Sequence, residues 1–258
     1  MKTLFIVGST GIGGATAKLA AQAGARVFVS SRTEANCRAL CDDIQRSGGT
    51  AAFFAADQTQ AAQVENAVAA CVEKFGTIDA AFNVAGISGR KFGDGPLHEC
   101  SEDGWDATLD TNAKGLFLFC RAQLRQMLAQ PIGANGLRGN ILNMASMLAL
   151  APQRDFFATH AYAASKGAII SMSRSMASYY APHKIRVNVI APSLVRTPMS
   201  RRAQENEAIL ELMKTKQPLV EDMIEAEDVA RAALFLLSDE SRVITGDVLC
   251  VDAGWGVS

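Results

Sequence analysis

Short apolar runs that alternate with longer segments of helical periodicity constrain the fold of this chain more than any other feature. The apolar runs are Leu4–Val7, Val27–Ser30, Ala51–Ala55, Ile78–Phe82, Asn140–Met144, Ile185–Ile190 and Val248–Val251. The helical segments that follow the first three runs end at Ala23, Arg46 and Phe75. Strands that are apolar along their whole length are covered on both faces. The sequence therefore predicts an α/β fold, with a doubly wound parallel sheet of about seven strands and helices on both faces.

Composition limits the domain organisation and the class of partner. With 258 residues, of which 49% are hydrophobic, the chain can bury one sizeable core, so we expect a single domain over residues 1–258. The formal net charge is −1, and the basic residues are scattered rather than gathered in a stripe. This pattern argues against nucleic-acid binding and favours small molecules as partners.

The cysteines and the apolar runs bear on location. The six cysteines include no Cys-x-x-Cys, and no histidine lies near the Cys37 and Cys41 pair, so no metal site is predicted. Cysteines within apolar or helical patterns fit reduced thiols in a cytoplasm. No apolar run reaches the roughly 18 residues that span a bilayer, and no cleavage-type site follows the N-terminus. We therefore expect a cytoplasmic protein without membrane contact.

A glycine-rich turn follows the first predicted strand, with the sequence Gly8-Ser9-Thr10-Gly11-Ile12-Gly13-Gly14. Glycines let the backbone approach a pyrophosphate, which binds the unpaired N–H groups at the positive end of a helix dipole. At the carboxyl edge of a parallel sheet, such a turn favours dinucleotide binding over a plain turn. We therefore expect a Rossmann-type cofactor site formed by Gly8, Ser9, Gly11, Ile12 and Gly13.

The ends of the next two strands bear on the choice of cofactor. A carboxylate after the second strand would bind the adenosine ribose diol and repel a 2′-phosphate. The chain instead has Ser31 and Arg32 there, and a guanidinium pairs with phosphate, so NADP(H) is favoured over NAD(H). A solvated arginine in a turn is the alternative interpretation. Asp57, after the third strand, either accepts from the adenine amino group or caps the next helix.

Tyr162 and Lys166 lie four residues apart in the sequence Tyr162-Ala163-Ala164-Ser165-Lys166. On a helix they share a face, and a nearby ammonium favours phenolate, so we expect the pKa of Tyr162 to be lowered toward neutrality. An ordinary amphipathic helix face is the alternative. Tyr180 and Lys184 have the same spacing, but Pro182 lies between them and disfavours a shared helical face.

Together these features resemble the short-chain dehydrogenase/reductase family, in its single-domain branch, over nearly the whole chain. Further residues that carry the resemblance are Asn83-Val84-Ala85-Gly86, Asn112, Ser146, Asn188 and the segment Ala191-Pro192-Ser193-Leu194-Val195-Arg196-Thr197. Their order along the chain matches the family, as does their placement at predicted strand ends.

The resemblance implies four catalytic residues. Tyr162 is expected to be the general acid/base, and Lys166 to bind the nicotinamide ribose and lower the pKa of the tyrosine. Ser146 is expected to hold the substrate oxygen, and Asn112 to organise a proton-relay water. From the residues alone, the alternative interpretations are that Ser146 is a strand-end serine that bonds to local backbone and that Asn112 is a helix-starting cap.

The resemblance also extends the cofactor site. Asn83 and Ala85 are expected to border the cofactor, while Val195 and Thr197 are expected to contact its carboxamide. Asn83 is also interpreted as a turn residue that satisfies neighbouring carbonyls.

Three departures from the family pattern are visible. Only Ser9 and Thr10 separate the first two glycines of the turn, a spacing closer to that of the longer-chain branch. The connection from Ser146 to Tyr162 is longer than usual, and Phe156, Phe157 and His160 within it are candidates to shape the substrate pocket. Finally, Ser193 stands where a glycine is usual.

The leading functional hypothesis is an oxidoreductase that transfers a hydride between NADP(H) and a ketone or secondary alcohol. A same-fold epimerase or dehydratase with a retained cofactor is one alternative, and a non-catalytic redox sensor is another. Arg90, Lys91 and Arg154 are candidates to recognise an anionic group, but solvated surface charges are the favoured interpretation. By resemblance we expect a homotetramer or homodimer formed through the helices of residues 113–129 and 162–180. Two segments, Ile87–Asp103 and Ser193–Pro218, are predicted to be binding loops or lids.

Overall fold

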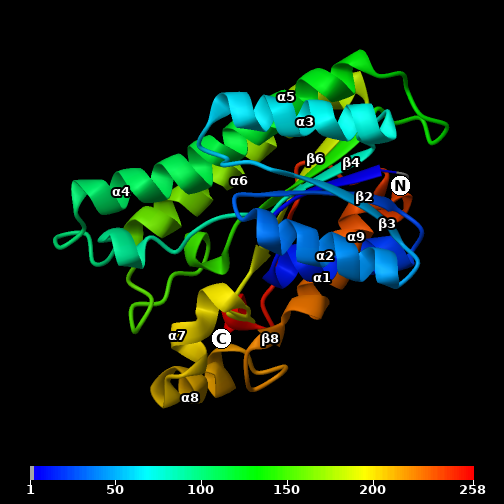
Figure 1. The fold of residues 1–258 in the computed structure, drawn as a ribbon. Helices are drawn as coiled ribbons and strands as arrows, with labels where there is room; N and C mark the ends of the chain where they lie inside the picture. The colour runs from blue at the N-terminus through cyan, green and yellow to red at the C-terminus, as the bar shows by residue number, and fades with distance from the viewer. Residues whose placement is uncertain (1–2) are drawn as a thin grey trace.

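The computed structural model describes residues 3–258 and confirms the predicted α/β fold class. The strands of the main sheet are β1 (Thr3–Val7), β2 (Arg26–Ser31), β3 (Thr50–Ala55), β4 (Ala80–Asn83), β5 (Gly139–Met144), β6 (Ile185–Pro192) and β9 (Val248–Val251). Within the described range they form a seven-stranded sheet in the order β3-β2-β1-β4-β5-β6-β9, with every neighbouring pair parallel (Figure 1).

Helices cover both faces of the sheet, as the apolar strands predict. Their bounds are α1 (Gly11–Gln22), α2 (Glu34–Arg46), α3 (Ala61–Phe75), α4 (Glu102–Leu109), α5 (Gly115–Ala129), α6 (His160–Tyr180), α7 (Arg201–Gln204), α8 (Glu207–Lys216) and α9 (Ala226–Leu237). One face packs against α3, α5 and α6, and the other against α1, α2 and α9 (Figure 1). Among residues 3–258, none of the helices combines the length and apolar character that crossing a bilayer requires.

Strand β1 shows why a continuous apolar run is needed at the centre of the sheet. Successive side chains of a strand point to opposite faces. Phe5 packs against Phe28 and Phe119 on one side, whereas Leu4 and Ile6 belong to the core on the other side. All three of these β1 side chains are fully buried. A polar residue at any of these positions would be desolvated without a partner.

The order of the strands fixes where a ligand binds. The chain moves from β1 outward through β2 to β3 and then returns to place β4 on the opposite side of β1. Ligands of open α/β sheets bind at such a reversal, beyond the carboxyl ends of the strands. Gly8 and Ser31 lie at these ends on one side of the reversal, and Ala145 and Ser193 lie on the other.

The two predicted loop segments differ in structure. Residues 87–103 contain only the short 3-10 helix η1 (Arg90–Phe92) and the start of α4. Residues 193–218 are mostly regular: they contain strand β7 (Val195–Arg196), the 3-10 helix η5 (Pro198–Ser200), α7 and α8. Strand β7 pairs in parallel with β8 (Ile224–Glu225), so this segment is tied to the chain that follows it.

Candidate active site

A cavity of about 780 Å³ lies at the carboxyl ends of the strands, around the reversal point between β1 and β4. Most of the predicted site residues line it, namely Gly8, Ser9, Gly11, Ile12, Ser31, Arg32, Asp57, Ala85, Ser146, Tyr162, Lys166, Val195 and Thr197. Gly13, Asn83 and Asn112 are not part of its lining. Tertiary structure therefore gathers residues that are far apart in the sequence around a single space.

The turn at the end of β1 is suited to a phosphate group. Gly8 has a φ of 128°, and a Cβ built there would lie 2.9 Å from Val84 Cγ1. Thr10 begins α1 without a side-chain cap, and the first turn of the helix contains no acidic residue. The first N–H groups of α1 thus remain open at the positive end of its dipole, so the turn fits the pyrophosphate of a dinucleotide.

Gly13 contributes through packing rather than by facing the cavity. A Cβ at this position would lie 2.5 Å from the Gly8 carbonyl oxygen and 2.9 Å from Val84 Cγ1. Only a glycine allows α1 to pack this closely on the turn.

The predicted adenosine end contains Ser31, Arg32 and Asp57. The Ser31 and Ser9 hydroxyls are hydrogen-bonded at 2.8 Å, which joins the end of β2 to the glycine turn. Arg32 is exposed, and its guanidinium has no acidic partner within the described residues. Asp57 accepts from the Thr59 N–H and hydroxyl at 2.9 and 2.8 Å while it lines the cavity. A contact between Asp57 and a cofactor stays a prediction.

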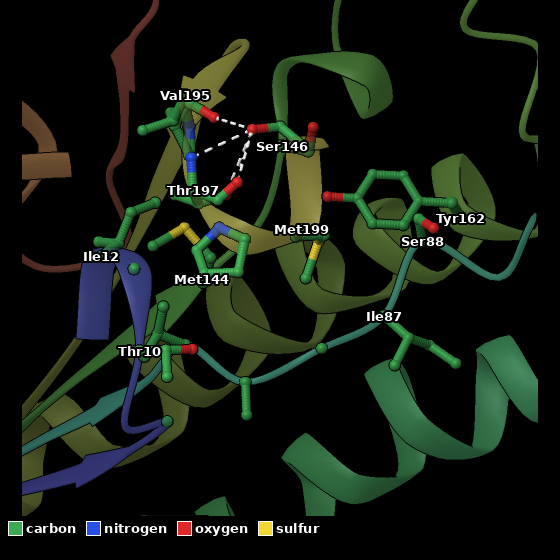
Figure 2. A pocket seen from close by; sticks show the side chains of 18 of the residues that line it. Thr10, Ile12, Ile87, Ser88, Met144, Ser146, Tyr162, Val195, Thr197 and Met199 are labelled. Carbon is green, nitrogen blue, oxygen red and sulfur yellow. Dashed lines mark hydrogen bonds between the residues drawn. The ribbon is translucent and has the colours of Figure 1, made fainter. Parts of the chain in front are cut away.

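Tyr162, Ser146 and Lys166 lie together at the other end of the cavity. Figure 2 shows the Tyr162 hydroxyl pointing into the cavity beside Ser146, and Val195 and Thr197 line the same cavity. Ser146 directly follows β5, and Tyr162 and Lys166 lie one turn apart on α6. The Lys166 ammonium lies 5.6 Å from the centre of the Tyr162 ring and donates to the Met144 carbonyl at 2.9 Å.

The electrostatics of this group differ from the sequence-based expectation. Burial raises the pKa of Tyr162, and a hydrogen bond with Ser146 acts in the opposite direction. Burial also lowers the pKa of Lys166 to about 8. The expected lowering of the phenol pKa by Lys166 is therefore not observed, because the loss of hydration on burial dominates for both groups.

Asn112 is fully buried within the π-helix η2 (Asp110–Lys114). Its side chain donates to the Ile87 carbonyl at 2.9 Å and accepts from the Ile87 N–H at 2.8 Å. It also donates to the Ser165 hydroxyl, which in turn donates to the Tyr162 carbonyl at 2.7 Å. The amide thus ties the connection after β4 to α6, and a π-helical turn is frequent near functional sites. A role in proton relay stays a prediction.

The Asn83 side chain lies beneath the site. Its amide nitrogen donates to the Gln123 and Asn143 side-chain oxygens, each at 3.0 Å, and its oxygen accepts from Gln123 at 2.9 Å. These partners occupy a buried position between β4, β5 and α5, which agrees with a structural role. The side chain has no free group directed at the cavity.

Asp94 is a site residue that the sequence did not single out. Its carboxylate accepts from the Ala161 and Tyr162 N–H groups at 3.0 and 2.9 Å, and the residue is only 6% exposed. Thr159, the residue before α6, provides no side-chain cap. Asp94 therefore caps this helix from a distant loop, next to the predicted proton donor. An aspartate between Gly93 and Gly95 predicts a turn, but the neighbouring residues do not indicate that its carboxylate contacts α6.

We expect Asp94→Ala to lower the free energy of unfolding by about 1–2 kcal/mol, because two N–H groups at the start of α6 lose their acceptor. The turnover number should fall as well, since the first helical turn holds Tyr162. Urea denaturation and steady-state rates measure the two effects. Asp155→Ala, which removes an exposed carboxylate from the preceding connection, is the matched control. Equal stability of Asp94→Ala and the parent would contradict the capping role.

The longer connection between Ser146 and Tyr162 contributes one wall of the cavity. Phe157 lines the cavity and packs edge-on against Trp255, with ring centres 5.6 Å apart. The Trp255 indole N–H donates to the Ala151 carbonyl at 2.9 Å, which anchors the C-terminal segment on this connection. His160 is exposed and is not part of the lining. Only Phe157 among the three expected pocket residues faces the cavity.

Known proteins share this arrangement over the full length of the chain. A family model described as enoyl-(acyl carrier protein) reductase matches residues 6–256. The chain is a short-chain dehydrogenase/reductase. Like other members, this short-chain dehydrogenase/reductase belongs to a group of oxidoreductases that bind nicotinamide dinucleotides.

Three relatives of this short-chain dehydrogenase/reductase are similar to it over nearly their whole length. A 2,5-dichloro-2,5-cyclohexadiene-1,4-diol dehydrogenase from Sphingobium indicum is 34% identical, over 98% of this chain and 96% of that protein. An A-factor type gamma-butyrolactone 1′-reductase (1S-forming) from Streptomyces virginiae is 35% identical, over 96% of this chain and 93% of that protein. The structure of an actinorhodin polyketide ketoreductase with NADPH superposes with a TM-score of 0.87 at 25% identity, covering 100% of this chain and 98% of that one.

Proposed function

We propose that this protein is an NADP(H)-dependent oxidoreductase that interconverts a ketone and a secondary alcohol. The observation that carries the proposal is the shared cavity, in which the Tyr162 hydroxyl, Ser146 and Lys166 lie beyond a phosphate-type turn. Relatives named as a dehydrogenase and a reductase agree with reversible redox chemistry at a carbon–oxygen bond.

The residues of the cavity supply the proton chemistry. A bound nicotinamide supplies or accepts the hydride. Because burial raises the pKa of Tyr162, the phenol is protonated at neutral pH and donates its proton to the substrate oxygen during reduction. The Ser146 hydroxyl stabilises the same oxygen as negative charge develops there. Lys166, whose pKa is about 8, is mostly cationic at neutral pH and adds positive charge beside the phenol.

The preference for NADP(H) is supported by Ser31 and Arg32. A serine at the end of β2 does not repel a 2′-phosphate, and the exposed Arg32 guanidinium lines the same end of the cavity. A guanidinium binds a phosphate through charge-assisted hydrogen bonds. One of the structural neighbours, the actinorhodin polyketide ketoreductase, was solved with NADPH.

We expect Arg32→Gln to lower the ratio of kcat/KM for NADPH to that for NADH by about tenfold or more, because one charge-assisted phosphate contact is lost. Ser31→Asp should lower the ratio further, since a carboxylate repels the 2′-phosphate. Initial rates with the two cofactors measure both ratios. Arg46→Gln, on the exposed end of α2, is the control. An unchanged ratio in both variants would contradict this assignment of the adenosine end.

The reaction class is tested by following nicotinamide absorbance with a panel of cyclic and linear ketones. A net loss of reduced cofactor that matches the alcohol formed supports the oxidoreductase. Substrate conversion without net cofactor change would instead indicate an epimerase or dehydratase. Firm NADPH binding without turnover of any substrate would favour a redox sensor.

We also propose that the protein assembles through α5 and α6, as a homodimer or homotetramer. Phe117 on α5 is 42% exposed, and Tyr179 near the end of α6 is 68% exposed. Apolar side chains exposed on long helices favour association. Sedimentation measures the state directly.

A further inference from the structure

Two arginines from segments far apart in the sequence face the same part of the cavity. Arg90 lies in η1, on the connection after β4, and Arg202 lies in α7, on the segment after β7. Both line the cavity, together with Lys91. The sequence made Arg90 and Lys91 candidates to recognise an anionic group, with solvated surface charges as the favoured interpretation, and it gave no reason to pair either with Arg202.

The main-chain carbonyl of Phe156 holds these arginines together. It accepts from Arg90 Nη2 at 2.6 Å and from Arg202 Nη2 at 3.1 Å. Phe156 has a φ of 63°, which is rare for a bulky side chain and is maintained only by surrounding contacts. Phe156 belongs to the longer connection before Tyr162. That connection therefore brings two guanidinium groups to one oxygen atom.

Neither guanidinium is neutralised by a carboxylate in the part of the chain that the structure describes. Arg154 and Arg201, on the neighbouring surface, are each paired with an acidic side chain. Asp94 is the acidic group that favours the charged form of Arg90, but both of its oxygens accept from the N-terminus of α6. Each guanidinium has five N–H donors, and one from each goes to Phe156.

The electrostatics of Arg90 indicate that the positive charges of Arg90 and Arg202 are not compensated by a nearby carboxylate. Burial lowers the pKa of Arg90, and repulsion from Arg202 lowers it further. Arg90 is half-buried and Arg202 is exposed, and two like charges next to each other raise the free energy of the free protein. An oxyanion between them would remove this repulsion and use the free N–H donors.

The arginine pair lies at the catalytic end of the cavity and not at the end assigned to the ribose phosphate. Arg90 follows β4 and Arg202 follows β6 and β7, whereas Arg32 follows β2 on the other side of β1. Asp94 links the pair to the reaction centre, since its carboxylate is near Arg90 and accepts from the Tyr162 N–H. A group bound by the pair is therefore part of the substrate.

We propose that the substrate is an oxo acid or its hydroxy acid, whose carboxylate binds between Arg90 and Arg202 while its carbonyl carbon lies at Tyr162. This inference rests on the proposed function and specifies its substrate class. The planar carboxylate matches the fork of a guanidinium, which is the usual reason that arginine is used for such groups. Lys91, which also lines the cavity, adds a third positive charge.

The test compares straight-chain oxo acids of increasing length with their methyl esters, with NADPH as the reductant. The selectivity is the ratio of kcat/KM for the acid to that for the ester. We expect the parent to favour the acid about tenfold or more at one chain length, since two charge-assisted hydrogen bonds are involved. Arg90→Gln and Arg202→Gln should each lower this ratio about tenfold, and the double variant should lower it further. Arg201→Gln, a neighbouring arginine paired with Glu205, is the matched control and should keep the parent ratio.

The outcomes separate this inference from the proposed function. A ratio near one for the parent at every chain length overturns the carboxylate site. So does a parallel loss of acid and ester rates in both variants, which a purely structural bond to Phe156 predicts. If neither the oxo acids nor their methyl esters are reduced, the proposed function fails. Calorimetric titration with a saturated dicarboxylate then decides the inference: binding to the parent and not to the double variant supports it, and equal or absent binding overturns it.

Discussion

Tyr162→Phe is expected to lower the turnover number by about 10²–10⁴-fold while the affinity for NADPH stays close to that of the parent. The substitution removes the hydroxyl that points into the cavity beside Ser146 and leaves the ring in place. The substitution does not touch the turn after β1, which is the proposed site of cofactor binding. The loss should therefore appear in kcat, with little change in the dissociation constant for NADPH.

The pH dependence follows from the raised pKa of Tyr162. Because burial keeps the phenol protonated, ketone reduction should be nearly constant through neutral pH and fall only in alkaline solution. Alcohol oxidation needs phenolate as the base, so the oxidation rate should rise with pH in alkaline solution, where the reduction rate falls. Steady-state rates in both directions measure these profiles, and an oxidation rate that is flat with pH would contradict the assignment.

Tyr180→Phe provides the matched control within the same helix. Tyr180 and Lys184 repeat the spacing of Tyr162 and Lys166, but α6 ends at Tyr180 and Lys184 has a left-handed backbone conformation. The second pair lies outside the cavity lining. Tyr180→Phe should therefore keep the parent turnover. If Tyr162→Phe also keeps it, the proton donor is another group.

Lys166→Met is expected to abolish most activity and, at neutral pH, to raise the free energy of unfolding by about 2 kcal/mol. The Lys166 side chain is only 3% exposed, and its ammonium has the Met144 carbonyl as its partner. Methionine has a similar length and no charge to bury. The gain is reduced by the lost hydrogen bond, which leaves the Met144 carbonyl without this donor.

The sign of this effect follows from proton binding. The pKa of Lys166 is about 8 in the folded protein, below the usual value of 10.5, so the unfolded chain binds more protons between these two pH values. Folding is therefore penalised below pH 8, by about 3 kcal/mol on the basis of the pKa difference, and the penalty disappears as pH rises toward 10.5.

Urea denaturation of the parent and of Lys166→Met at pH 7 and about pH 10 tests this expectation. The stability difference should be largest at pH 7 and should shrink at the higher pH. Lys184→Met, which removes an exposed lysine, serves as the control and should show no pH-dependent gain. A variant less stable than the parent at pH 7 would mean that the hydrogen bond to Met144 outweighs the burial of charge.

The fold and the glycine turn after β1 were predictable because their signals are local. A strand that is buried on both faces must be apolar at consecutive positions, as Leu4, Phe5 and Ile6 are. The turn after β1 needs glycine where its backbone has a positive φ, as at Gly8. Such requirements act within a few residues and leave a readable pattern. The spacing of Tyr162 and Lys166 is local in the same way.

Other features of the site could not be predicted, because they depend on contacts between distant segments. Asp94 caps α6 across 68 positions of sequence, and Arg90 reaches the Phe156 carbonyl across 66. Neither segment has a composition that points to the other. The position of Asn112 also required the structure, since a helix-cap residue and a buried amide look the same in the sequence.

The sequence by itself determined the layered sheet, the phosphate-type turn and the identity of the residues at the carboxyl edge, because each follows from backbone geometry or hydrophobic periodicity. Only the tertiary structure decided how these groups behave. The pKa values of Tyr162 and Lys166 follow from burial, and desolvation depends on everything that packs around a group. The arginine pair likewise exists only because three distant connections meet at one edge of the sheet.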